Sequence, residues 1–401
     1  MMNSQMPDRD SLNYINKQYT AFLESTVTVS NQAVKAYFQA LNEFFTSPAK
    51  LYRRNMDYFQ EVITPPRPEW QTPHRIVTLP REFEKQIKLL DFSQDDVPSD
   101  SVVPTLVLPP QAGHHSYIAD YSHDQSQVQT LRHAGLGAMY CIEWVSATRA
   151  TANTTVEDYM RMLKHIAQML GGKVNLVGDC QGGWLAAIFA AMYPDMVNTL
   201  SIAGAPINFQ AGDGPIVQQV NYIAKTYPDK GMAFYRNLVA MGGGLLNGNF
   251  MVMGFNLMRP QQLPERFLNL YQHMHDPGAV HRFKQMKNWY DFAQNIPGSF
   301  YLWLVEHLFR DNELIQGKLV VGGRKLNLAD YKNPLFLMGG KRDHITPPVQ
   351  VLDMRKYVGT APEHIYEYVV PAGHIGLFMG KDILRSTWTP ISKKILAYSQ
   401  K

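Results

Sequence analysis

The sequence predicts an α/β fold with a mostly parallel central sheet. From about residue 100 onward, short apolar runs typical of buried strands alternate with segments of helical periodicity. This alternation is typical of a parallel sheet that helices cover on both faces. An aromatic-rich helical segment precedes the alternation, and a Met-rich segment interrupts it. We therefore predict an N-terminal helical extension at 1–65, core segments at 74–205 and 326–401, and a cap or lid insertion at 206–325.

The composition is that of a globular protein. The chain has 401 residues, 45% of them hydrophobic and 18% charged, which is enough apolar material for a large core. The net charge of +4 is not gathered in a dense Lys/Arg run, so we expect no nucleic-acid partner. Two cysteines cannot build a disulfide framework and fit a reducing compartment.

The sequence also lacks several targeting and cofactor signals. The polar N-terminus does not have the layout of a signal peptide. The longest apolar run, Trp184 to Met192, is too short to cross a bilayer, so we expect no transmembrane segment and a cytoplasmic protein. Metal-ligand spacings and a dinucleotide-type glycine loop are missing, and we expect neither a metal nor a resident cofactor.

Residues 1–65 are predicted to be helical, with a new helix starting at Ser47 and Pro48. Packing on the main domain and docking to a partner or hydrophobic surface both explain the apolar stripe before this point. The stretch 65–73, PPRPEWQTP, is predicted to be a linker. The stripe consists of residues at steps of three and four: Val34, Tyr37, Phe38, Leu41, Phe44 and Phe45.

Helices and strands follow in order through the core. A Thr154-x-x-Glu157 capping box is predicted to open a helix that ends at Gly171-Gly172. The next helix, 182–193, is apolar on every side and should be buried. The expected strands are 102–108, 137–142, 174–178, 198–203, 334–338 and 365–370.

The run VNLVGDCQGG, residues 174–183, places one of the two cysteines in an unusual setting. Cys180 lies between Gly178 and Gly182, directly after a predicted strand and before a predicted helix. This arrangement is typical of a nucleophile elbow, whose sharp turn leaves no room for side chains on either flank. The N–H of Gln181 would then face a developing oxyanion. A buried cysteine in a glycine-rich turn is the alternative interpretation.

An elbow requires an acid and then a histidine later in the chain. Asp343 and His374 each lie just past the carboxyl end of a predicted strand, where open parallel sheets bind ligands. We predict that Cys180 attacks an acyl carbonyl, that His374 transfers the proton and that Asp343 orients the imidazole. A loop-capping role for Asp343 and a structural role for His374 are the alternatives.

Further histidines and one cysteine lie close to these motifs. His344 either contacts substrate or packs locally. The loop 111–115 follows the first core strand, where it would supply the second oxyanion N–H, and the side chains of His114 and His115 either join the site or pack. Cys141 lies inside a predicted strand and is expected to be inert core.

The sequence around these residues resembles the polyhydroxyalkanoate synthases, especially the short type that works with a second subunit. The resemblance runs from about residue 74 to the C-terminus, through VNLVGDCQGG, PLFLMGGKRDHITPP and PAGHIGLFMGK. It implies an α/β-hydrolase fold whose Cys-His-Asp triad polymerises 3-hydroxyacyl-CoA thioesters into polyester and releases CoA. By matching position, Cys180, Asp343 and His374 inherit the triad, and His344 matches the histidine beside the family's acid.

The sequence departs from that family at three places. Glu143-Trp144 replaces the usual Asp-Trp pair, and Asp179 stands where the family often has tyrosine or an apolar residue. The loop 109–120 looks more like that of uncharacterised relatives. Intracellular polyester depolymerases share the GH-x-G-x-F pattern of residues 373–378. These departures leave the direction of the reaction open.

Three functions follow from these observations. The leading expectation is a synthase-type acyltransferase that takes 3-hydroxyacyl-CoA as its substrate and passes the acyl group to a hydroxyl. The alternatives are a polyester depolymerase or thioesterase with the same triad, and a non-catalytic granule-associated or scaffold protein. The expected partners are 3-hydroxyacyl-CoA or polyester, with a second subunit or a homodimer left open, and the expected location extends to polyester granules.

Overall fold

The computed structural model describes residues 9–93, 102–260 and 262–400. The chain divides into two compact units. One, the helical unit, comprises Met1–Pro68 and Asn249–Phe292. The other, the core unit, comprises Glu69–Gly248 and Ala293–Lys401 and contains the central sheet.

The core unit is built on an eight-stranded sheet in the order β1-β2-β6-β3-β7-β8-β13-β14. From β6 to β14 all neighbours are parallel, and β2 and β1 extend the sheet in antiparallel pairing. This sheet, with a sharp strand-to-helix turn after β7, is that of an α/β-hydrolase fold, as the sequence predicted. The strands are β1 (Arg75–Val77), β2 (Ile87–Asp91), β3 (Thr105–Leu108), β6 (Met139–Trp144), β7 (Val174–Asp179), β8 (Val197–Ala203), β13 (Leu335–Gly340) and β14 (Ile365–Val370).

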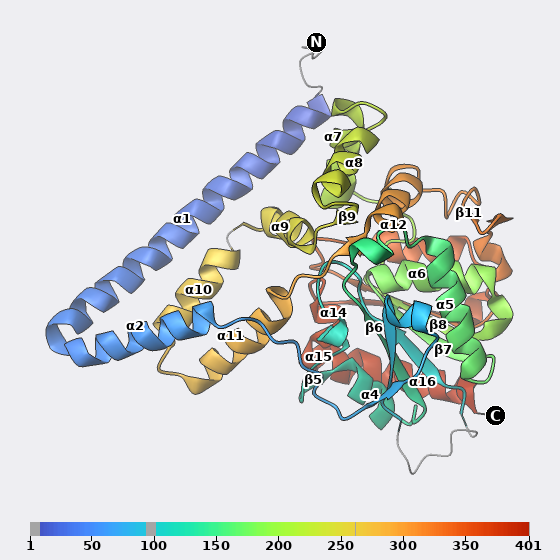
Figure 1. Cartoon of the computed structure of the whole chain (residues 1–401), viewed down its shortest axis with the longest axis horizontal. Helices are drawn as coiled ribbons and strands as arrows, with labels where there is room; N and C mark the ends of the chain where they lie inside the picture. The colour runs from blue at the N-terminus through green and yellow to red at the C-terminus, as the bar shows by residue number, and fades with distance from the viewer. Residues whose placement is uncertain (1–8, 94–101, 261, 401) are drawn as a thin grey trace. The chain divides into compact units, whose positions relative to one another are not determined.

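Helices cover both faces of the sheet (Figure 1). Helices α5 (Val156–Met169) and α6 (Gln181–Met192) lie on one face, and α4 (Gln127–His133) and α16 (Thr389–Ser399) on the other. Because both faces are covered, β3 and β7 are buried along their whole length rather than alternating between buried and exposed residues.

The core unit contains several shorter helices and π-helical segments. Around α7, α8 and η4, the side chains of Ile223, Met232, Tyr235 and Val305 form an apolar cluster. The bounds are α3 (Arg81–Glu84), α7 (Pro215–Thr226), α8 (Met232–Met241), α12 (Gly298–Trp303), η4 (Leu304–Arg310), α13 (Pro348–Leu352), α14 (Gly376–Met379), α15 (Lys381–Ile383) and η8 (Leu384–Trp388).

Several expected boundaries differ from the structure, and two of them are instructive. The capping box of α5 uses Thr155 and Asp158, one residue later than predicted: the Thr155 N–H donates to Asp158 Oδ2 at 2.9 Å, and the Asp158 N–H donates to Thr155 Oγ1 at 3.3 Å. The pairs Thr154–Glu157 and Thr155–Asp158 both have the residue types and spacing of a capping box, so the sequence pattern alone cannot distinguish them. The strand expected at 102–108 is also shorter, since Val102 makes only an isolated bridge with Gln400.

The helical unit contains α1 (Arg9–Thr46), α2 (Pro48–Ile63), α10 (Gln262–Gln272), α11 (Pro277–Tyr290) and most of α9 (Gly248–Met258). Ser47 is the N-cap of α2 and Pro48 its first residue, as predicted. The buried Arg54 joins three helices: it donates to Glu43 of α1 at 2.7 Å and to the hydroxyl of Tyr271 of α10 at 2.9 Å.

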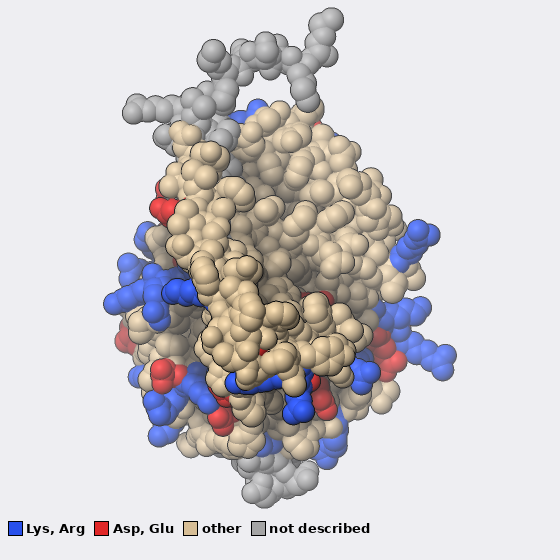
Figure 2. Space-filling view, turned by 90° about the vertical axis from the view of Figure 1, so that its left-hand side faces the viewer, with Lys and Arg blue, Asp and Glu red and all other residues tan. Residues whose placement is uncertain are grey.

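The predicted apolar stripe of α1 is exposed in the structure. Phe38 is 61% exposed and Phe45 76%. Figure 2 views the molecule from the side of α1 and α2, and uncharged side chains cover much of the surface seen there. Among the described residues, every helix is too short or too polar to cross a bilayer.

Candidate active site

The turn between β7 and α6 holds Cys180 in a strained conformation. Its φ of 49° and ψ of −120° lie outside the regions that L-residues ordinarily occupy. The Cys180 N–H donates to the carbonyl of Ala203 on β8 at 2.9 Å, which holds the turn against the sheet. Strain of this kind costs about 1–3 kcal/mol and clusters at functional sites.

The flanking glycines explain how this turn is accommodated. A Cβ on Gly178 would lie 2.5 Å from the Cα of Gly183, and a Cβ on Gly182 would overlap the carbonyl oxygen of Leu108 on β3. The backbone segments approach too closely for any side chain at either position. The structure therefore has the close approach that the G-x-C-x-G pattern predicted.

The acid and the histidine meet as neighbours past the ends of β13 and β14. His374 Nδ1 is 2.8 Å from Asp343 Oδ2, and both side chains are buried. The other carboxylate oxygen of Asp343 accepts the N–H groups of Ile345 and Thr346, each at 2.9 Å. These bonds fix the carboxylate, so that it in turn fixes the orientation of the imidazole.

The imidazole of His374 connects the acid to the cysteine. It is hydrogen-bonded to Asp343, and Cys180 lies close enough for its charge to raise the pKa of the imidazole. The ring of Phe378 packs edge-on against it, with centroids 5.4 Å apart and an interplanar angle of 88°. The structure thus brings together Cys180, His374 and Asp343, which come from three separate parts of the sequence.

Electrostatics favour a charged histidine in this chain of hydrogen bonds. Burial alone disfavours the imidazolium, but the charges of Cys180 and Asp343 outweigh it and raise the pKa of His374 to about 10. A protonated imidazole beside a cysteine can stabilise negative charge on the sulfur, and this arrangement is used by many cysteine nucleophiles.

Two backbone segments border the elbow. Gln181 is the first residue of α6, and N–H groups in the first turn of a helix have no intrahelical acceptor. The loop after β3 is held by Trp144, whose indole N–H donates to Pro109 O at 2.8 Å and whose backbone N–H donates to Ser116 Oγ at 2.9 Å. Oxyanion binding by these two segments stays a prediction.

Three further histidines were predicted to lie at or near the site: His114, His115 and His344. His114 is buried and His344 is half-buried. Burial lowers the pKa of His115 to about 4, although Glu143 acts in the opposite direction, and its Nδ1 accepts the Tyr117 N–H at 3.1 Å. His115 is therefore a neutral histidine at physiological pH, and roles for His114 and His344 stay predictions.

Sequence reasoning assigned no role to Asp179 and missed Gln127. Asp179 ends β7 and is fully buried, and Gln127 Nε2 donates to its Oδ1 at 3.1 Å. Burial raises the pKa of Asp179 to about 7. The available signal was a carboxyl group directly after the predicted strand 174–178. Cys141 is fully buried in β6, as predicted, and burial raises its pKa well above the ordinary range.

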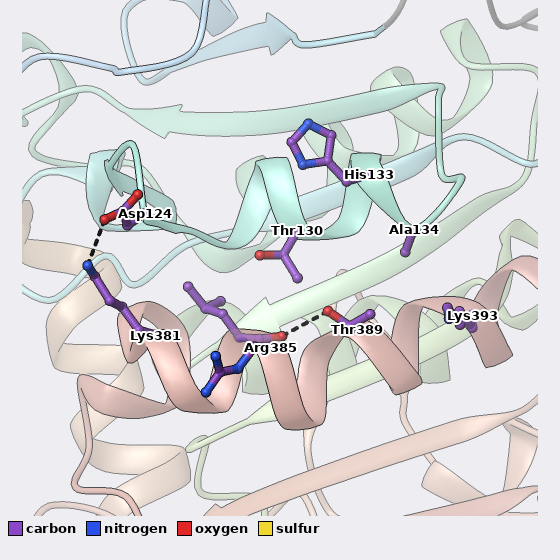
Figure 3. Close-up of a pocket in the computed structure, with 9 residues that line it drawn as sticks. Asp124, Thr130, His133, Ala134, Lys381, Arg385, Thr389 and Lys393 are labelled. Carbon is purple, nitrogen blue, oxygen red and sulfur yellow. Dashed lines mark hydrogen bonds and ion pairs between the residues drawn. The ribbon is translucent and has the colours of Figure 1, made fainter.

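A surface cavity of about 410 Å³ lies between α4 and the C-terminal helices (Figure 3). Lys381, Arg385 and Lys393 line it, and Lys381 donates to Asp124 at 2.6 Å across it. Exposed ion pairs of this kind contribute little and are screened by salt. The elbow, with the strained Cys180 and the buried His374–Asp343 hydrogen bond, is therefore the better candidate site.

Comparison with known proteins identifies relatives of the whole core. Residues 70–395 match the family described as protein of unknown function (DUF3141). The chain is 26% identical to the poly(3-hydroxyalkanoate) polymerase subunit PhaC of Haloferax mediterranei over 337 residues, 80% of this chain and 63% of that protein. It is 25% identical to PhaC of Allochromatium vinosum over 284 residues, 69% of this chain and 76% of that protein. These relatives confirm the resemblance inferred from the sequence.

Solved structures with a similar fold are more distant. A monoacylglycerol lipase from Paleococcus ferrophilus matches with 18% identity and a TM-score of 0.45, covering 75% of this chain and 98% of the lipase. An epoxide hydrolase from Bacillus megaterium matches with 13% identity and a TM-score of 0.44, covering 80% of this chain and all of the hydrolase.

Proposed function

The chain belongs to the DUF3141 family, whose members have unknown function, and on that premise we propose that it is a polyhydroxyalkanoate synthase-like acyltransferase. The observation that carries the proposal is the buried His374–Asp343 hydrogen bond beside the strained Cys180 of a strand-to-helix elbow. The similarity to PhaC polymerase subunits supports hydroxyacyl thioesters as the substrate class.

The first half-reaction would load an acyl group on the enzyme. Cys180 Sγ attacks the thioester carbonyl of a 3-hydroxyacyl-CoA, and the N–H of Gln181 faces the developing oxyanion. The carbon–sulfur bond to CoA then breaks. The departing CoA sulfur takes the proton of His374, and an acyl-Cys180 thioester remains. CoA is therefore part of the substrate and is released as a product, and the reaction does not use it as a resident cofactor.

The second half-reaction would transfer that acyl group to an alcohol. The now neutral His374 accepts the proton of a hydroxyl group at the end of a growing polyester, and the oxygen attacks acyl-Cys180. An ester forms, the Cys180 sulfur leaves, and the charged pair with His374 is restored. Asp343 stabilises the imidazolium at both stages and keeps Nε2 directed at the sulfur. Water in place of the alcohol would convert the same site into a hydrolase.

We also propose that the protein acts at the surface of polyester granules, with a second subunit or a second copy of itself. The exposed apolar stripe of α1 supports an additional contact, since apolar patches of this extent commonly mark interaction sites. Light scattering of the purified protein, alone and with nascent polyester, measures both forms of association.

The decisive experiment follows CoA release from 3-hydroxybutyryl-CoA by thiol titration and identifies the product. The wild type is compared with Cys180→Ala, which removes the nucleophile, and with Cys141→Ala, which removes a buried thiol from β6. We expect the wild type and Cys141→Ala to release CoA and form insoluble polyester, and Cys180→Ala to lose at least 10³-fold in rate, as expected for loss of a nucleophile.

The other outcomes select the alternatives. CoA release that needs Cys180 but yields only free hydroxy acid would identify a thioesterase or depolymerase. Equal measurable rates in the wild type and Cys180→Ala would refute the acyltransferase. No release from either folded protein, with the second subunit present, would favour a scaffold role.

A further inference from the structure

A second buried carboxyl group lies beside the proposed nucleophile. Asp179 directly precedes Cys180 and is fully buried at the end of β7. Its Oδ1 accepts from Gln127 at 3.1 Å, and within the described residues its Oδ2 has no hydrogen-bond partner. A buried carboxylate with so little hydrogen bonding is costly, which makes a purely structural role a poor explanation.

Three groups on separate elements bear on the charge of Asp179. From the loop after β14, the imidazolium of His374 interacts with the carboxyl group and lowers its pKa, opposing the larger effect of burial. From α4, the amide of Gln127 acts in the same direction as His374. Cys141 of β6 is a neutral thiol, because burial and then the Asp179 charge raise its pKa.

We propose that Asp179 is a positioning residue whose carboxylate stabilises the protonated imidazole of His374, and thereby keeps the Cys180–His374 pair in its charged, reactive form. The inference rests on the proposed function of that pair. Coupling between two titrating sites is reciprocal, so a carboxyl group that responds to the imidazolium must favour the imidazolium in return. Asp343 fixes one ring nitrogen, and Asp179 adds a second negative charge without occupying the nitrogen that faces the sulfur.

The pH range of this effect follows from the burial of Asp179. Its pKa of about 7 means that the carboxylate forms as the pH rises through neutrality. Stabilisation of the His374 imidazolium is therefore weak in acid and fully present in mild alkali. Gln127 strengthens the effect, because its N–H favours the ionised form of Asp179.

Alkylation of Cys180 by iodoacetate tests the proposal without any acyl substrate. The anionic reagent reacts fastest with a thiolate beside an imidazolium, so the alkaline limb of the rate–pH profile reports loss of the His374 proton. Modification is measured on the peptide that contains Cys180, so that the buried Cys141 does not contribute. At the pH where the wild-type rate has fallen by half, we expect Asp179→Asn to react about three- to five-fold more slowly, because its limb lies at lower pH.

A second variant separates this effect from a change in folding. Gln127→Leu removes the hydrogen bond to Asp179 and leaves the carboxyl group in place. We expect it to leave the alkaline limb close to the wild-type pH, because Asp179 is already ionised there with or without this hydrogen bond. A limb that stays at the wild-type pH in a folded Asp179→Asn protein would overturn the proposal, as would an equal shift in Gln127→Leu, which would indicate repacking rather than loss of the carboxylate.

The experiment also distinguishes failure of this inference from failure of the proposed function. A wild-type profile without an alkaline limb that depends on His374, judged by His374→Ala, would refute the reactive pair itself. A normal wild-type profile with an unchanged Asp179→Asn profile would refute only the role of Asp179.

Discussion

Two helices with many apolar residues occupy opposite environments. Helix α6 follows the elbow, and its residues from Gly182 to Ala191 are all buried. Helix α1 is more than three times as long, and its aromatic residues, such as Tyr37 and Phe44, are largely exposed. Apolar composition therefore does not determine burial: α6 has a sheet to cover, and α1 presents its stripe on the surface.

The contrast extends to the way in which each region tolerates change. Around α6, backbone and side chains pack so closely that adding or removing atoms should lower the free energy of unfolding. On the exposed face of α1, most substitutions should change the free energy of unfolding very little, because the side chains there make few contacts. The following predictions sharpen this contrast, beginning with the largest effect.

Gly182→Ala should cause the greatest loss. Its Cβ would overlap the carbonyl oxygen of Leu108, which is backbone and cannot move without displacing β3. We expect a loss of more than about 4 kcal/mol in the free energy of unfolding, or failure to fold, because the overpacking involves main chain. Thermal unfolding by calorimetry measures it, and an unchanged midpoint would show that the elbow is less constrained than described.

Ile188→Ala should cost about 2–5 kcal/mol, because it leaves a cavity in the fully buried helix α6. The matched change Phe38→Ala, on the exposed face of α1, should cost less than about 0.5 kcal/mol. Urea unfolding of both variants makes the comparison. Equal losses would mean that the stripe of α1 is covered in solution.

Asp179→Asn should stabilise the core unit in a pH-dependent way. Burial raises the pKa of Asp179 to about 7, so the folded protein holds a proton that the unfolded chain releases near pH 4. The stability contribution of this group is full below pH 4 and is lost as the pH rises to 7. At pH 8 the variant should gain about 4 kcal/mol relative to wild type, compared with pH 4, since the shift spans about three pKa units. A pH-independent difference in melting would contradict the assignment.

Gly254→Ala should give the smallest effect, and in the opposite direction from Gly182→Ala. Gly254 lies inside α9, where an added Cβ meets open space. Alanine favours the helix, so we expect a gain of about 0.5–1 kcal/mol in the helical unit. Slower amide hydrogen exchange in α9 would report the gain, and faster exchange would show that the glycine is needed.

The sequence by itself predicted the features that depend on local backbone geometry. Gly178 and Gly182 mark a turn in which side chains do not fit, and Cys180 between them follows from that pattern. Asp343 and His374 were found because the ends of parallel strands meet at one edge of a sheet. Strands β7 and β14 were recognised from short apolar or β-branched runs, which need no knowledge of their neighbours.

Only the tertiary structure decided which groups are buried together. It chose Thr155 over Thr154 as the cap of α5, extended the sheet by β1 and β2, and left the stripe of α1 exposed. It also buried Asp179 against Gln127 and near His374. From the sequence, Asp179 is only a departure from the synthase pattern; in the structure it is a carboxyl group that titrates near neutral pH beside the site. The physical reason is that burial, and the pKa values that depend on it, arise from contacts between residues far apart in the chain.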